Sequence, residues 1–128
     1  GAAARASQRR MNPHMLEKVR SEELLESIRH IDHCTLRISS FAGQPCSGPI
    51  DACHLPVFGK GVGTKVTDLA AVAGCRRCHS LLDHDRLGVE LTGRFPYEWM
   101  QRLLFALVET QAMLVIEGII EVKGAKLI

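Results

Sequence analysis

The 128-residue sequence predicts one domain of the α+β class, small enough to gain stability from a bound metal ion. Three observations support this prediction. Apolar residues recur at helical spacing near both ends of the chain. Between these segments, two short apolar runs flank a glycine-rich loop, which is typical of an antiparallel pair of strands. The second run leads into Cys75-Arg76-Arg77-Cys78-His79, where a C-x2-C pair on a tight turn can direct both thiolates at one ion.

The composition is that of an ordinary globular protein, with 46% hydrophobic and 23% charged residues. No apolar run approaches the roughly 18 residues of a membrane helix, and no apolar signal-peptide core follows the N-terminal arginines. We therefore expect a cytoplasmic protein without a membrane partner. In a reducing compartment, the C-x2-C spacing is better explained by metal binding than by disulfides. Because the formal net charge is only +2, any affinity for nucleic acid must come from local clusters of basic residues.

Residues 1–15 are small, basic and without apolar periodicity, so they are predicted to be a disordered arm or a remnant of an expression vector. Between Gly1 and Arg20 there are five basic residues and one acid. Such an arm can follow phosphates, although a solvated tail is the simpler interpretation. Residues 16–128 are expected to form the single domain.

The first predicted helix runs from Ser21 to about His30. Ser21 is a suitable N-cap, acidic residues follow it in the first turn, and leucines and isoleucines recur at helical spacing. Residues 35–39 alternate enough to predict a strand. A loop rich in glycine and proline follows over residues 41–48 and carries Cys46.

Two further strands are predicted over residues 50–55 and 69–73, on either side of the glycine-rich loop 57–67. That loop lacks the strand-to-helix Gly-Lys-Ser/Thr context of a nucleotide-binding loop, so ATP binding is not predicted. A helix should then begin near Arg77 and run to about Asp85.

The longest helix is predicted over about 96–112, with Pro96 in its first turn and Trp99 in the core. Residues 113–122 are apolar and β-branched, and they predict a terminal hairpin or a pairing edge. Association into a homodimer through this tail is left open, since a strand that closes its own domain would have the same composition.

The C-x2-C pair needs two more ligands to complete a zinc site, and the obvious candidates are Cys34 and Cys46. Four thiolates around Zn²⁺ would make a closed structural site. His30 and His33, close to Cys34, are alternative ligands, although solvent-exposed histidines at a helix end are the simpler interpretation.

His79 and Asp83 lie four residues apart, so a helix would place both side chains on one face. One imidazole and one carboxylate on one face suit a divalent ion that keeps open positions for water and substrate. Taken alone, such a pair is more simply a surface hydrogen bond. The adjacent C-x2-C pair and His54, at the end of a predicted strand, favour the ion.

In this order, the features resemble those of the HNH, or His-Me finger, nucleases, which share a ββα-metal core; here that core would span about 50–86, with flanking helices. More narrowly, the chain resembles the small YbcO-like nucleases of lambdoid phages and prophages. The resemblance covers roughly 21–118 and rests on an ordered set of motifs: the Cys34/Cys46 pair, Ala52-Cys53-His54-Leu55, Gly61-Val62-Gly63-Thr64-Lys65, Asp68-Leu69, Cys75-x2-Cys78-His79 and Asp83.

The resemblance implies an endonuclease that hydrolyses DNA phosphodiester bonds in the cytoplasm of a bacterial host. His54 would be the general base, and Asp68 would orient its imidazole. His79 and Asp83 would hold one Mg²⁺, Mn²⁺ or Zn²⁺ ion. A separate structural zinc would be held by Cys34, Cys46, Cys75 and Cys78.

The chain departs from the family pattern at one position. Many HNH proteins place a metal-binding Asp or His directly before the base, where this chain has Cys53. A thiolate is a poor ligand for Mg²⁺, so Cys53 is interpreted as a buried strand residue.

Duplex or branched DNA is the expected partner, and its predicted contacts are the basic residues Lys60, Lys65, Arg76 and Arg77. The competing hypothesis is a non-catalytic, zinc-containing DNA-binding module with the same fold. A C-x2-C redox protein is disfavoured because no βαβ pattern surrounds the motif.

Overall fold

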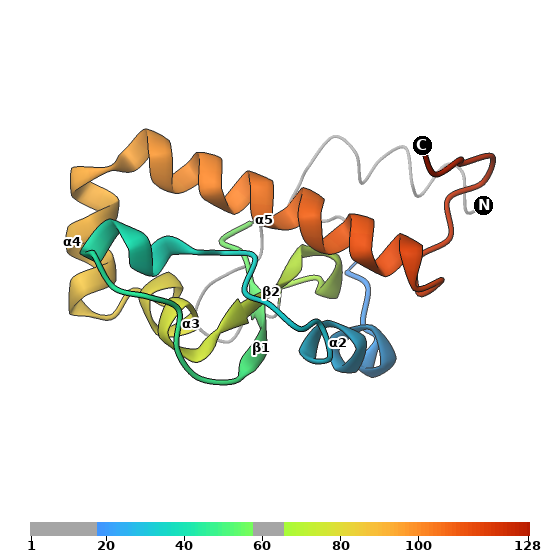
Figure 1. The fold of residues 1–128 in the computed structure, drawn as a ribbon, viewed down its shortest axis with the longest axis horizontal. Coiled ribbons are helices and arrows are strands. Elements are labelled where there is room, and N and C mark those ends of the chain that lie inside the picture. Colours follow the sequence, from blue (N-terminus) through green and yellow to red (C-terminus); the bar gives the residue numbers. More distant parts are fainter. Residues whose placement is uncertain (1–17, 58–65) are drawn as a thin grey trace.

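The computed structural model describes residues 18–57 and 66–128, and its architecture is mixed α/β (Figure 1). Within these ranges a two-stranded sheet is combined with four α-helices. The elements are α2 (Glu22–Arg29), β1 (Ile50–His54), β2 (Ala71–Cys75), α3 (Arg76–Leu82), α4 (Arg86–Arg94) and α5 (Pro96–Ile116), with the 3-10 helices η2 (Ile38–Ala42) and η3 (Asp68–Ala70). The predicted N-terminal arm, residues 1–15, lies outside the described residues.

The two strands pair antiparallel, with Ile50 opposite Cys75 at one end and His54 opposite Ala71 at the other. Every residue of β2 is buried. Gly74 lies where a side chain would not fit, because a Cβ there would come within 2.5 Å of Leu36 Cδ1. The close approach of neighbouring segments makes β2 the centre of the fold.

Alternate residues of β2 belong to two hydrophobic clusters, because successive side chains of a strand point to opposite faces. Val72 is part of the larger cluster, with residues of α3, α4 and the first half of α5. Ala71 and Ala73 belong to the smaller one, which α2 completes together with Leu114 near the end of α5. Helix α5 runs along the length of the molecule in Figure 1 and contributes to both clusters.

The predicted first helix is confirmed as α2. The Ser21 side chain accepts a hydrogen bond from the backbone N–H of Leu24, as expected of an N-cap. Leu24 and Ile28 are the buried residues of this helix. Because Ser21 also contacts Asp68, the start of α2 is tied directly to the candidate site described below.

The predicted strand over residues 35–39 is wrong. This segment runs beside β2 and bonds to it through Thr35, whose backbone N–H and hydroxyl both donate to Ala73 O. Arg37 then adopts a left-handed conformation with φ 53°, and η2 begins at the next residue. Leu36 and Ile38 are buried, so the alternation in the sequence reflects core packing without a strand.

The second strand of the pair is shifted from the predicted 69–73 to Ala71–Cys75. Asp68 to Ala70 form η3, capped by Thr67, whose side chain accepts a hydrogen bond from Leu69 N–H. The helix predicted from about Arg77 to Asp85 is shorter, at Arg76–Leu82.

The predicted hairpin over residues 113–122 is also wrong, because α5 continues to Ile116. Thr110 and Leu114 extend the buried face of the helix past the point where the prediction ended it. Gly118, with φ +76°, follows the C-cap, as a helix stop requires.

Helix α4 was not predicted. Asp85 caps it by accepting a hydrogen bond from Gly88 N–H. Two glycines, Gly88 and Gly93, weaken the helical pattern in the sequence. Gly88 is required by packing, since a Cβ there would collide with the carbonyl of Leu81 in α3.

By length and composition, α5 is the one helix in the described part of the chain that is long and apolar enough to cross a membrane. This is weak evidence, because the core helix of a soluble protein meets the same test. One face of α5, including Trp99 and Leu103, is buried in the core. The cytoplasmic location and the absence of a membrane partner stay predictions.

Candidate functional site

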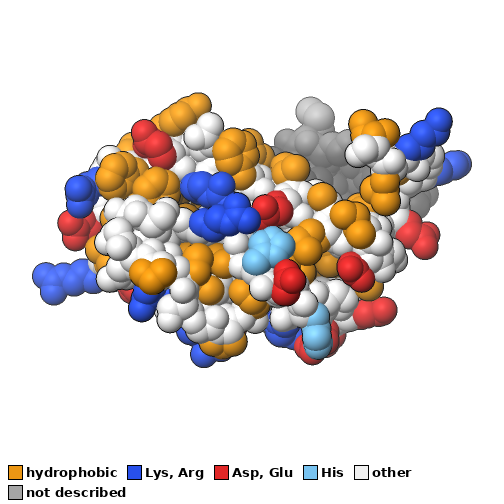
Figure 2. All heavy atoms as spheres, viewed as in Figure 1, with side chains coloured by type: hydrophobic (Ala, Val, Ile, Leu, Met, Phe, Trp, Pro, Cys, Tyr) orange, Lys and Arg blue, Asp and Glu red, His pale blue; other side chains and the backbone are white. Residues whose placement is uncertain are grey.

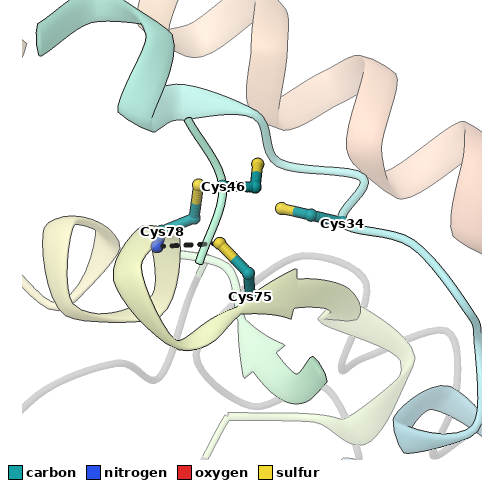
Figure 3. A group of neighbouring side chains, drawn as sticks. All are labelled: Cys34, Cys46, Cys75 and Cys78. Carbon is teal, nitrogen blue, oxygen red and sulfur yellow. Dashed lines mark hydrogen bonds between the residues drawn. The ribbon is translucent and has the colours of Figure 1, made fainter. Parts of the chain in front are cut away.

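Four cysteines from separate segments converge on one point (Figure 3). Their sulfur atoms all lie within 4.8 Å of one another, and three of the four residues are buried. The cysteines are those predicted: Cys34, Cys46, Cys75 and Cys78. In a tetrahedral zinc site with Zn–S bonds of about 2.3 Å, the sulfurs would be about 3.8 Å apart, so the cluster fits the ion.

Every sulfur of the cluster accepts a hydrogen bond from a neighbouring group. The donors are the backbone N–H groups of Arg37, Ser39, Ser47 and Cys78, each at 3.4 Å, and the Ser39 hydroxyl at 3.8 Å from Cys46 Sγ. Hydrogen bonds to sulfur favour the thiolate, which is the form that binds zinc. The cluster is therefore prepared to hold negative charge.

A proton is shared unequally within the cluster. The Cys78 thiol donates to Cys34, which lowers the pKa of Cys34 to about 4 and raises the pKa of Cys78. Zinc binding would release the protons that remain on the cluster and leave four thiolates. Because all four ligands come from the protein, this arrangement is compatible with a structural zinc rather than with an open, catalytic one.

The remaining cysteine is separate from this cluster. Cys53 is fully buried in β1, with Sγ 3.6 Å from Asp51 O and 3.8 Å from Gly74 O. Burial raises the pKa of its thiol, and the nearby carboxylate of Asp51 raises it further. The interpretation of Cys53 as a buried strand residue is confirmed.

His54, the last residue of β1, is held by a buried carboxylate. Its Nε2 atom lies 3.0 Å from Asp68 Oδ1. Asp68 is 5% exposed and also accepts hydrogen bonds from Ser21 N–H at 2.7 Å and from Arg20 Nη1 at 3.4 Å. Burial opposes its ionisation, but the bonds from His54 and Ser21 outweigh burial, so the pKa of Asp68 is lowered.

The predicted pair on α3 is in contact, since His79 Nε2 lies 3.2 Å from Asp83 Oδ2. A third residue, which the sequence analysis missed, completes this group. Asp51 Oδ2 lies 3.0 Å from His79 Nδ1, so the imidazole is held between two carboxylates. The available signal was a charged residue inside an otherwise apolar strand, two positions before Cys53.

Asp51 is in turn fixed by Arg76, whose Nε and Nη2 atoms donate to its two oxygens at 2.7 and 3.0 Å. The Arg76 guanidinium, and after it His79, hold the pKa of Asp51 down at about 2. Arg77 donates to Pro45 O at 2.8 Å. Both arginines predicted to contact DNA therefore also have bonds within the chain, while Lys60 and Lys65 lie outside the described residues.

Helix α3 connects the two parts of the site. It begins beside the cysteine cluster, and the pair on it, His79 and Asp83, lies against β1. Besides burial and Asp51, the Asp83 carboxylate raises the pKa of Cys53, the residue directly before His54. The contact of α3 with β1 is thus at Asp51, three residues before His54 on the strand.

Compared with protein-family models, curated proteins and solved structures, the chain gives no match. Its function must therefore be argued from these residues. Within the described residues, the four cysteines are the one group of three or more ligands that lie close enough together to hold a metal ion. His79 and Asp83 are arranged as a hydrogen-bonded pair beside Asp51.

Proposed function

We propose that this chain is an HNH-like endonuclease of the phage or prophage type that hydrolyses DNA phosphodiester bonds. Its core would be a zinc-stapled ββα-metal unit made of β1, β2 and α3. The observation that carries the proposal is the contact of His54 Nε2 with the buried Asp68 carboxylate, 3.0 Å away, at the end of a strand next to α3. A histidine positioned by a buried carboxylate is a common form of general base.

The hydrogen bond determines which nitrogen of His54 acts. If Nε2–H donates to Asp68, the lone pair of the imidazole is on Nδ1. Asp68 would hold the imidazole in one orientation during proton transfer. Burial raises the pKa of Asp68, but the hydrogen bonds from His54 and Ser21 N–H lower it by more, so the orienting carboxylate stays an acceptor.

His79 and Asp83 would hold the divalent ion, Mg²⁺ or Mn²⁺, with Zn²⁺ as an alternative. When bound, such an ion stabilises charge on the phosphate and on the leaving oxygen. Asp51 would accept the Nδ1–H of His79 and so direct Nε2 toward the ion, as carboxylates beside metal-binding histidines commonly do. Arg76 would keep that carboxylate in place.

Cleavage of supercoiled plasmid by His54→Ala tests the assignment of the base. We expect a rate lowered by about 10²- to 10⁴-fold, with unchanged zinc content and unchanged DNA affinity, because His54 is not a zinc ligand. The control is His30→Ala, which replaces an exposed histidine at the end of α2. If His54→Ala cuts as fast as His30→Ala, His54 is not the base.

One observation favours a second function, a zinc-containing DNA-binding module without catalysis. Both ring nitrogens of His79 already have carboxylate partners in Asp51 and Asp83. Such a chain of hydrogen bonds is satisfied without a metal ion and would serve a purely structural role. Under this hypothesis the protein binds DNA in a salt-dependent manner and does not cut it with any divalent ion.

A further inference from the structure

The outer face of α5 carries a stripe of exposed apolar residues. Four large side chains that no other part of the described chain covers are spaced along it: Tyr97, Met100, Leu104 and Val108, with exposed fractions of 72, 58, 58 and 60%. At 100° per residue, they lie within about 40° of one line along the helix. Val115, the last residue but one of α5, lies on the same line. Figure 2 shows hydrophobic side chains gathered along this outer edge.

An open hollow of about 590 Å³ lies at the C-terminal end of the stripe. The chain turns back after α5, and the hollow is lined mainly by apolar residues, among them Val115, Ile120, Val122 and Leu127. At the opposite end of the stripe, Tyr97 is the most exposed of the four large side chains. One end of α5 thus presents an aromatic side chain, and the other end presents an apolar receptacle.

We propose that this surface binds a second copy of the chain, with the two α5 helices antiparallel about a two-fold axis. Pairing Tyr97 with Val115 of the second copy puts each Tyr97 at the other copy's hollow. The same register places Leu104 opposite Val108 and Gln101 opposite Gln111. Apolar side chains then face apolar ones, and the two amides face each other, as a self-complementary interface requires.

Exposed charges of both signs lie at the two ends of α5. The N-terminal end carries Arg94 and Glu98, and the segment after the C-terminal end carries Glu121 and Lys123, all exposed. A helix that lies on a membrane surface would instead carry mostly Lys and Arg beside its apolar face.

The oligomeric state of the zinc-loaded full chain tests this interface, measured by sedimentation velocity over a range of about 1 to 200 µM. The wild type should be a dimer at the upper end of the range. Leu104→Glu should weaken the dimer by at least about 100-fold, because the two-fold axis buries the added carboxylate twice. Val89→Glu is the matched control, since Val89 is 57% exposed on α4, away from the stripe, and this variant should remain a dimer.

The direction of pairing has its own readout. A photoreactive benzoylphenylalanine in place of Tyr97 should cross-link to a peptide of the other copy within residues 115–127. A wild type that stays monomeric at the highest concentration overturns the proposal. The proposal is overturned in the same way if that monomer binds anionic lipid vesicles in a flotation assay. A dimer that Leu104→Glu does not weaken, or a cross-link that joins the N-terminal ends of the two helices, overturns it as well.

Discussion

Replacing Cys46 with serine should destabilise the protein far more than its exposure suggests. Cys46 is the one exposed member of the cysteine cluster, and residues 43–49 around it are all exposed. An exposed loop substitution normally changes the free energy of unfolding by less than about 0.5 kcal/mol. A large effect at this position would therefore mean that Cys46 in the loop and the buried cysteines bind one ion.

The expected size follows from the ligand count. Structural zinc sites contribute roughly 10 to 16 kcal/mol of apparent binding free energy, so one of four ligands accounts for about 3 kcal/mol. For a chain of this length, that is a fall in Tm of roughly 10 °C. The cluster should also lose much of its zinc, because a serine hydroxyl is a far poorer ligand than a thiolate.

Cys53→Ser is the matched control. Cys53 is fully buried but lies outside the cluster, with the carbonyls of Asp51 and Gly74 near its sulfur. A serine hydroxyl can donate to one of them, so we expect a loss of about 1 kcal/mol and an unchanged zinc content. Zinc released by acid, together with thermal unfolding with and without chelator, measures both variants. If Cys46→Ser keeps its Tm and one zinc per chain, the four-cysteine assignment is wrong.

Two further predictions concern packing and pH. Gly88→Ala should lower the free energy of unfolding by about 2 kcal/mol, because its Cβ would collide with the Leu81 carbonyl. Gly93→Ala, in the same helix with open space around it, should raise that free energy by about 0.5 kcal/mol. The urea midpoints of the two variants are compared, and equal midpoints would contradict the packing of α3 on α4. Asp51 has a folded-state pKa of about 2, below its ordinary value of 3.8, so its ionisation stabilises the fold fully above about pH 4 and progressively less as the pH falls toward 2. The difference in unfolding free energy between wild type and Asp51→Asn should be about 1 kcal/mol near neutral pH, a small value because solvent screens the largely exposed Arg76. This difference should shrink as the pH falls from about 4 toward 2. A difference that stays constant over this range would contradict the ion pair.

The parts of the fold that the sequence predicts well are those set by local chemistry. Ser21 before acidic and regularly spaced apolar residues predicts α2, and an apolar run that ends before a proline predicts β1. The errors occur where tertiary packing decides. Residues 35–39 alternate like a strand, but the segment packs Leu36 and Ile38 into the core without forming one. Residues 113–116 continue α5 because Leu114 completes the smaller cluster. Gly88 weakens the helical pattern of α4 in the sequence, although contact with α3 requires a glycine at this position.

The candidate site divides in the same way. Helical spacing alone predicts the contact between His79 and Asp83. The need of the C-x2-C pair for two more ligands predicts that the four cysteines lie together. The role of Asp51 depends on the register that sets it opposite Gly74, at the start of the turn into α3, and no pattern in the sequence specifies that register. Likewise, the two bonds from Arg76 to Asp51 became visible only once β1 and α3 were placed together.

The most direct test of the proposed function uses the unmodified, zinc-loaded protein freed of other divalent ions. Supercoiled, branched and single-stranded DNA are offered to it with Mg²⁺, Mn²⁺ or additional Zn²⁺ in turn, and strand cleavage and bound zinc are measured in the same samples. We predict cleavage that begins when one of these ions is added and stops with chelation of that ion, while one zinc per chain stays bound throughout. Binding of all three DNA forms without cleavage by any ion would contradict the endonuclease and leave the DNA-binding module.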